Sequence, residues 1–252
     1  MSTVEMYPGA EDTEVLRRDV ATGCRIAGHR GLCEDILGHI SVRSEDSLLI
    51  RCRGPRESGL IFTEITDVRR ASYEGGLMEK AAGFSVPNEI HIHTEILKVR
   101  SDVQAVFHAH PPAIVALDLA GLELLPVVGA YNIPASRMAA KGIPLYSRSV
   151  LVNTPALGAE VAEVLGDSPA CVMRGHGLVT VGRTVAEAVS RALSLNSLAR
   201  MMLRSASAGR VPAALPAQDL AQLPDLGAGF NDAHLWRFET AALRAMGLDL
   251  AD

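Results

Sequence analysis

Eight histidines carry the clearest chemical signal in this sequence of 252 residues. Two of them, His108 and His110, end the apolar stretch 105–110, which is typical of a buried strand. Residues two apart on a strand point to the same side, so both imidazoles can meet one metal ion, at about 2.0–2.1 Å from each nitrogen. A polar strand end at the surface shows the same pair, but the apolar run before it and Pro111 after it favour a metal ion.

A third imidazole, that of His176, stands between Gly175 and Gly177, which allow a sharp turn and close approach to a ligand. Three protein ligands with an open position are typical of a catalytic zinc site. Spacing alone is equally compatible with a turn histidine exposed to water. The sequence therefore predicts either a site of three histidines or a pair with a separate surface histidine.

Glu89 opens a predicted helix, 87–100, that leads into the strand of His108 and His110. The short connection predicts that its carboxylate returns to the same site, as a fourth ligand or as a general acid or base. An ordinary acid at a helix N-terminus is the alternative. His93 lies one turn after Glu89 and is its expected neighbour, whereas we expect His91 to be solvated.

Helices and strands alternate around these residues without a regular βαβ rhythm, and no phosphate-binding glycine motif is present. The sequence predicts one α/β domain over 1–252, a single α/β/α layered domain with a central mixed or antiparallel sheet. Its core spans about 13–205, and a helical tail spans 206–252. Predicted helices are 13–30, 87–100, 112–121, 154–165, 184–206 and 230–246; predicted strands are 38–43, 48–53, 105–110, 170–174 and 178–181.

Composition narrows the classes of partner. The net charge of −5 gives no concentrated basic surface for nucleic acid. Charges and a proline interrupt the most apolar stretch, 113–131, so we expect no membrane span. The first fourteen residues hold four acids and no basic residue, which is unlike a secretory signal. The four cysteines form no CxxC pair, so we expect reduced, mostly buried thiols in a cytoplasmic protein.

Several segments carry a joint pattern that is more specific than any one of them: 38–43, 49–54, Asn88–Glu89, His108–Pro111 and Arg174–Gly177. On these segments the sequence resembles the class II aldolase/adducin-type family over about 13–205. The resemblance implies the α/β/α class II aldolase fold, often a tetramer with sites between subunits, and hence a homotetramer here. It implies that His108, His110 and His176 bind a divalent metal, typically zinc, with Glu89 as a further ligand or acid/base.

The sequence departs from the sugar-phosphate aldolases of that family where those enzymes hold phosphate. The matching positions here are His39, Arg53–Gly54 and Pro87–Asn88. A guanidinium suits a carboxylate, which it grips with two parallel hydrogen bonds. We therefore expect a small-molecule carboxylic acid to bind at His39, Arg53, Gly54 and Asn88. Arg43 is expected to add to that positive field, and Arg56 is expected mainly to be solvated.

The pattern looks closest to the decarboxylase branch of the family. It predicts a metal-dependent carbon–carbon lyase that decarboxylates a hydroxylated aromatic dicarboxylic acid such as 3,4-dihydroxyphthalate. A hydroxy-carboxymuconic semialdehyde decarboxylase, an aldolase for a non-phosphorylated hydroxy-keto acid and a non-catalytic adducin-like module are the alternatives. Zinc is the expected metal, although imidazoles and a carboxylate also accept manganese, cobalt or iron. Tyr131 is weighed as an auxiliary acid, with a packed loop tyrosine preferred.

Overall fold

A seven-stranded mixed sheet organises the computed structural model, which describes residues 13–250 apart from the side chains of 228 and 229. The strand order is β3-β2-β1-β4-β7-β6-β5, and every neighbouring pair is antiparallel except β5 and β6. This confirms the predicted mixed sheet. The strands are β1 (His39–Ser44), β2 (Ser47–Arg51), β3 (Val68–Ala71), β4 (Ala105–Ala109), β5 (Leu145–Tyr146), β6 (Ala170–Met173) and β7 (Gly177–Gly182).

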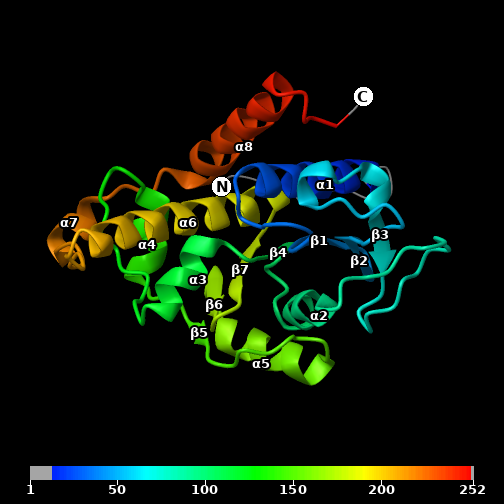
Figure 1. The fold of residues 1–252 in the computed structure, drawn as a ribbon, viewed down its shortest axis with the longest axis horizontal. Helices are drawn as coiled ribbons and strands as arrows, with labels where there is room; N and C mark the ends of the chain where they lie inside the picture. The colour runs from blue at the N-terminus through cyan, green and yellow to red at the C-terminus, as the bar shows by residue number, and fades with distance from the viewer. Residues whose placement is uncertain (1–12, 251–252) are drawn as a thin grey trace.

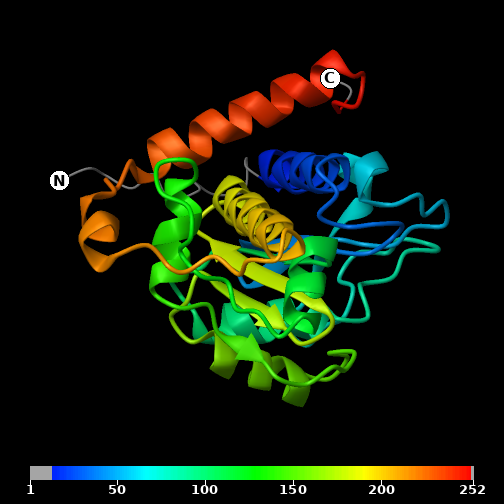
Figure 2. The same cartoon turned by 60° about the vertical axis from the view of Figure 1, so that its left-hand side comes forward.

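Helices cover both faces of the sheet and make the predicted α/β/α layering (Figures 1 and 2). One face packs against α1, α3 and α6, with α8 lying outside α1 and α6, and the other face packs against α2 and α5. The helices are α1 (Thr13–His29), α2 (Ile90–Val99), α3 (Pro112–Leu119), α4 (Ile133–Ala140), α5 (Pro155–Leu165), α6 (Val185–Ser207), α7 (Ala217–Gln222) and α8 (Gly227–Ala245).

Strand alternation divides the interior into two apolar cores. On β1, Ile40 and Val42 point into the core beneath α1 and α6. On the neighbouring strand β2, Leu48 and Ile50 point into the other core, against α2 and α5. Both strands are buried on both faces, so polar side chains that they carry lie inside the protein rather than in water.

The structure corrects several predicted elements. The helix expected to begin at residue 87 begins at Ile90, with Glu89 as its N-cap. Strand β3 and helix α4 lie where the sequence analysis predicted no element. On α8, Phe238 is 63% exposed, whereas Leu243 is buried. Helix α6 has its expected N-cap at Thr184, whose hydroxyl accepts the N–H of Glu187.

A buried arginine ties helix α1 to the C-terminal end of the described chain. The guanidinium of Arg25 donates to the carbonyls of Thr63, Leu248 and Asp249, at 2.7–2.9 Å. It also forms an ion pair with Glu64 at 2.6 Å. The Arg25 residue is 7% exposed, so these acceptors satisfy a charge that would otherwise be costly to bury.

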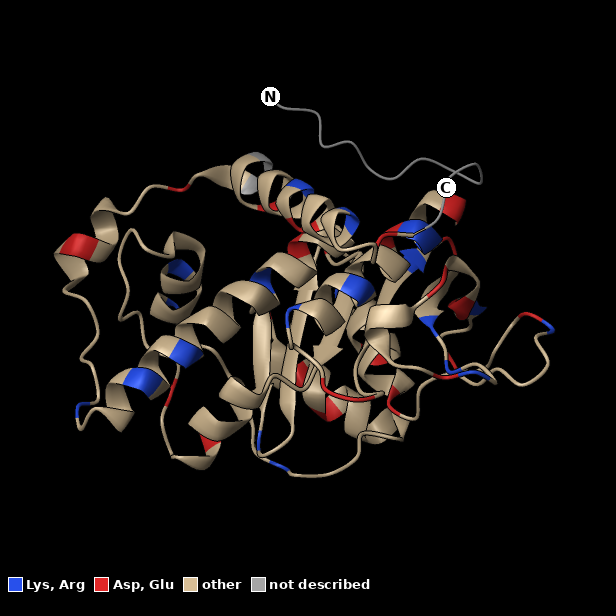
Figure 3. Ribbon diagram, turned by 45° about the horizontal axis from the view of Figure 1, so that its top comes forward, with Lys and Arg blue, Asp and Glu red and all other residues tan. Residues whose placement is uncertain are grey.

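Lys and Arg residues and Asp and Glu residues are interspersed along the described elements (Figure 3). None of the described helices is long and apolar enough to cross a membrane. All four cysteines are buried and free, as expected.

Candidate metal centre

Four side chains from three separate segments meet at one end of the sheet. Glu89 caps the start of α2, His108 lies on β4, His110 directly follows that strand, and His176 lies in the turn between β6 and β7. Each offers one ligand atom, and these atoms all lie within 4.8 Å of one another. The structure thus brings together all four residues that the sequence interpretation named as ligands or acid.

The nitrogens of the imidazoles face inward. The Nε2 atoms of His108 and His110 lie 2.8 Å apart, and the Nε2 atoms of His108 and His176 each lie 3.4 Å from Oε2 of Glu89. The three rings meet pairwise at centroid distances of 4.7–5.0 Å. Three imidazole nitrogens and one carboxylate oxygen are the donor set that zinc and similar divalent ions prefer.

Two orphaned atoms test whether a cation fits this centre. Nδ1 of His108 and Nδ1 of His176 are fully buried and have no hydrogen-bond partner among the described residues. A neutral imidazole carries its proton on one nitrogen, so inward-facing Nε2 lone pairs require that proton to lie on Nδ1. Packed lone pairs facing a carboxylate are mutually repulsive unless a cation lies between them. The residues therefore fit a divalent metal ion.

Glu89 has a different partner for each carboxylate oxygen. Its Oε1 accepts the backbone N–H of Val152 at 3.0 Å, while its Oε2 faces the histidines. Burial disfavours the charged carboxylate, but the neighbouring His108 and His176 outweigh burial and hold the pKa of Glu89 below its usual range. The chain thus presents an ionised ligand whose orientation the backbone fixes.

Glycine is required where the β6–β7 turn meets β4. A Cβ atom on Gly177 would lie 2.2 Å from the carbonyl oxygen of Ala109. Gly175 has a φ of +56°, a conformation that favours glycine, and its N–H donates to Asp118 of α3 at 2.7 Å. The turn thereby holds His176 against the end of β4, which favours the first of the two alternatives that the sequence left open for His176.

A second group of polar side chains adjoins the centre. His39 on β1 pairs in register with His108 on β4, and their rings lie 5.2 Å apart. Nδ1 of His39 lies 2.7 Å from Nε2 of His93, and Nδ1 of His93 lies 2.7 Å from Oγ of Ser41. His93 was expected beside Glu89; its hydrogen bonds go instead to His39 and Ser41. Burial and neighbouring imidazoles lower the pKa of His39, and similarly lower that of His93 to about 3.

The predicted carboxylate site follows β2. The backbone of Arg53 pairs with that of Ser85 at 3.0 and 2.9 Å, which ties it to the segment leading into Glu89. The Arg53 guanidinium is without a hydrogen bond or ion pair to another described residue. Gly54 packs closely on Phe84 and, with the exposed Arg56, lines a cavity of about 740 Å³. Asn88 is exposed. Substrate binding by Arg53, Gly54 and Asn88 stays a prediction.

Arg43 was expected to add to the carboxylate field, and this expectation is wrong. Its guanidinium donates to the carbonyls of Leu97, Arg100 and Val103 at 2.6–3.3 Å and to the hydroxyl of Tyr73 at 2.9 Å. These acceptors follow the C-terminal end of α2, so Arg43 satisfies helix-end carbonyls.

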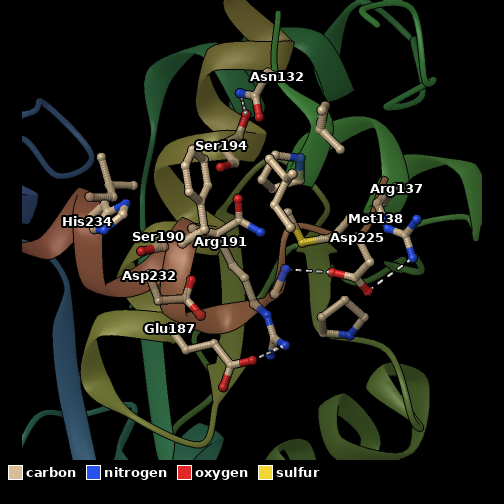
Figure 4. A pocket seen from close by; sticks show the side chains of 18 of the residues that line it. Asn132, Arg137, Met138, Glu187, Ser190, Arg191, Ser194, Asp225, Asp232 and His234 are labelled. Carbon is tan, nitrogen blue, oxygen red and sulfur yellow. Dashed lines mark hydrogen bonds and ion pairs between the residues drawn. The ribbon is translucent and has the colours of Figure 1, made fainter. Parts of the chain in front are cut away.

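A cavity of about 860 Å³ lies between α4, α6 and α8 and excludes the four-residue centre (Figure 4). Two ion pairs line it, Arg191 with Glu187 at 2.5 Å and Arg137 with Asp225 at 3.2 Å. Tyr131 lines this cavity and is 69% exposed, so the packed loop tyrosine preferred from the sequence is not observed.

Comparison with known proteins agrees with the fold. The Class II Aldolase and Adducin N-terminal domain family matches residues 18–203. The chain belongs to this family.

Similar curated proteins indicate the decarboxylase branch of this family. A 3,4-dihydroxyphthalate decarboxylase from Arthrobacter keyseri is 48% identical over 91% of this chain and 94% of its own length. Proteins of the same name from Terrabacter sp. and Rhodococcus jostii are 49% and 44% identical over 90% and 91% of this chain and 96% of their own lengths.

Solved structures share the fold at lower identity. An aldolase II superfamily protein from Pseudomonas syringae superposes with a TM-score of 0.82 at 21% identity, covering 96% of this chain and 97% of that one. An L-fuculose 1-phosphate aldolase from Glaciozyma antarctica gives a TM-score of 0.77 at 19% identity, covering 98% of each chain.

Proposed function

We propose that this protein is a metal-dependent carboxy-lyase that removes one carboxylate, as CO2, from a hydroxylated aromatic dicarboxylic acid, with 3,4-dihydroxyphthalate as the substrate. The observation that carries the proposal is the meeting of three inward-facing imidazoles and one carboxylate within 4.8 Å. The 44–49% identity to 3,4-dihydroxyphthalate decarboxylases over most of the chain supports the substrate.

Decarboxylation leaves the electron pair of the broken bond on a ring carbon, where a proton from solvent must replace CO2. A divalent metal, when bound, supplies a Lewis acid that stabilises negative charge on an adjacent substrate oxygen. His108, His110, His176 and Glu89 are the residues that would hold it. Both oxygens of Glu89 already have partners, which supports a role as ligand rather than as proton donor.

The chain's other residues bind and orient the substrate in this proposal. The unpaired guanidinium of Arg53 holds a carboxylate by two parallel hydrogen bonds, beside Gly54 and Asn88. His39, only 6% exposed and adjoining His108, contacts the end of the substrate nearest the metal. Electrostatic binding by these groups suits a dianionic acid, since the substrate's carboxylates meet a guanidinium and imidazole N–H groups.

We also propose zinc as the metal, a homotetramer and a cytoplasmic location. The donor set of three nitrogens and one oxygen supports zinc. Apolar side chains on α8, with Phe230 53% and Phe238 63% exposed, support an assembly that covers them. Four buried free thiols support a reducing compartment. Metal analysis and light scattering coupled to size-exclusion chromatography test the first two points directly.

Aldol cleavage is the second candidate function, because L-fuculose 1-phosphate aldolases share the fold. The two reactions differ in product. Zinc-loaded protein is incubated separately with 3,4-dihydroxyphthalate, a hydroxy-carboxymuconic semialdehyde and non-phosphorylated aldols, and CO2 and aldehyde are measured. Release of CO2 from the dihydroxyphthalate supports the proposal. Aldehyde without CO2, or undiminished CO2 release after complete demetallation, overturns it.

A further inference from the structure

A continuous chain of three hydrogen-bonding side chains runs from the sheet interior to the metal centre. It begins at Ser41, passes through His93 of α2 and ends at His39, with both links 2.7 Å long. Ser41 and His93 are 0% exposed, and His39 is 6% exposed. The outer nitrogen of His39, Nε2, lacks a hydrogen-bond partner among the described residues, yet it is not sealed from solvent as Nδ1 of His108 is.

The hydroxyl of Ser41 sets which atoms donate and which accept along these hydrogen bonds. The only hydrogen bond of the Ser41 hydroxyl among the described residues is the one to Nδ1 of His93. If His93 donated that bond, the buried hydroxyl proton would have no acceptor, which costs about 1–3 kcal/mol. If Ser41 donates it, the protons of both Ser41 and His93 have acceptors, because Nε2–H of His93 then donates to Nδ1 of His39. The proton of a neutral His39 must in that case lie on Nε2.

We propose that Ser41, acting through His93, locks His39 in the tautomer that presents an Nε2–H donor to an anionic oxygen of the substrate beside the metal centre. Ser41 and His93 are positioning residues, and His39 is the group that touches the substrate. The inference rests on the proposed function for the identity of that substrate, a hydroxylated aromatic dicarboxylate. It adds a residue set that recognises the oxygen.

The same chain excludes His39 as the source of the proton that replaces CO2. Passing a proton out through His39 would move one from His93 to His39 and one from Ser41 to His93, leaving a buried serine alkoxide. No described base restores that proton. The chain therefore orients a neutral donor and transfers no net proton, and a donor fixed in advance stabilises developing negative charge without reorganising.

Histidine-selective 15N labelling with magic-angle-spinning NMR tests the tautomer without requiring turnover. The sample is the zinc-loaded protein, and His39→Gln identifies the His39 signals by their loss. We expect Nε2 of His39 to carry the proton and its resonance to move when phthalate, a dicarboxylate probe, is added. A proton on Nδ1 of His39 in the wild-type protein overturns the proposal.

Matched variants then separate the effect of the hydrogen-bond direction set by Ser41 from the effect of removing any buried hydroxyl. Ser41→Ala removes the donor that sets the chain, so we expect both tautomers of His39 and a several-fold fall in kcat/KM. Ser47→Ala removes another fully buried hydroxyl, which bonds the carbonyl of Ser44 at 2.7 Å, and we expect unchanged His39 signals and kinetics. An unchanged His39 tautomer in Ser41→Ala, or an equal change in Ser47→Ala, overturns the proposed role of Ser41.

Two substitutions of His39 distinguish a donor from an acid. His39→Gln keeps an N–H group and is expected to retain kcat/KM within about tenfold, whereas His39→Leu loses about 10- to 100-fold, the range for a hydrogen bond to a charged group. Equal losses in both variants overturn the donor role. Failure of the CO2 assay would remove only the proposed function, because the NMR result with phthalate stands on its own.

Discussion

Replacing Glu89 separates two tasks that its two oxygens perform. Gln at this position keeps a carbonyl oxygen for the N–H of Val152 but loses the negative charge that faces His108 and His176. Ala removes both. We expect both variants to bind zinc at least about tenfold more weakly than the wild-type protein, and only Glu89→Ala to destabilise the metal-free fold appreciably.

The difference in stability follows from burial. Val152 is 0% exposed, so Glu89→Ala leaves its N–H without an acceptor at a cost of about 1–3 kcal/mol. Glu89 is 5% exposed, and loss of its buried γ-methylene adds roughly 1 kcal/mol. We therefore expect Glu89→Ala to lower the free energy of unfolding by about 2–4 kcal/mol. Glu89→Gln is expected to stay within about 1 kcal/mol of the wild-type value.

Urea unfolding of the metal-free proteins measures the free energy of unfolding, and calorimetric zinc titration measures the affinity for zinc. Similar slopes in urea would show that the compared transitions expose similar surface. Equal destabilisation by Gln and Ala would refute the role assigned to the Val152 contact. Unaltered zinc affinity in both variants would refute Glu89 as a ligand.

Four further predictions concern the neighbouring residues. His108→Ala should abolish both turnover and bound zinc while the circular dichroism spectrum stays native-like, and normal zinc content in the variant would contradict this. Arg53→Met should mainly raise KM for the dicarboxylate in steady-state kinetics; an unchanged KM would remove Arg53 from the pocket. Gly177→Ala should cost about 1–3 kcal/mol in urea unfolding and weaken zinc binding, because its Cβ would meet Ala109. Burial and the neighbouring His108 lower the pKa of His93 to about 3. Between pH 6.5 and about 3 the unfolded chain binds a proton that the folded chain excludes, so the stability of the metal-free protein should fall as the pH drops through this range. Urea unfolding midpoints should fall less steeply with pH in His93→Gln.

Local sequence patterns predicted that His108 and His110 point to one side, and they left open whether His176 joins them; the structure brings all three together. The HxH pair depends on strand periodicity and the third histidine on its glycines, and both are properties of a few adjacent residues. The sheet was predicted as mixed or antiparallel, and only β5 and β6 pair in parallel.

Long-range contacts account for what the sequence did not reveal. Strand alternation places His39, Ser41 and Arg43 on one face of β1. It does not show that helix α2 brings His93 to His39 and Ser41, or that carbonyls at the end of α2 accept hydrogen bonds from Arg43. The acceptor of Glu89, the N–H of Val152, lies 63 residues away in the sequence and has no side-chain signal. Positions of this kind depend on how helices dock rather than on residue type.

The hydrogen bonds that Arg25 donates to the carbonyls of Leu248 and Asp249 have a practical consequence for work with this protein. A substitution or cleavage that displaces residues 248 and 249 would remove two acceptors of an enclosed guanidinium. Their loss would leave that charge poorly satisfied and would weaken the link between α8 and α1. An unexpectedly low melting temperature in a variant altered in this segment is explained by this junction.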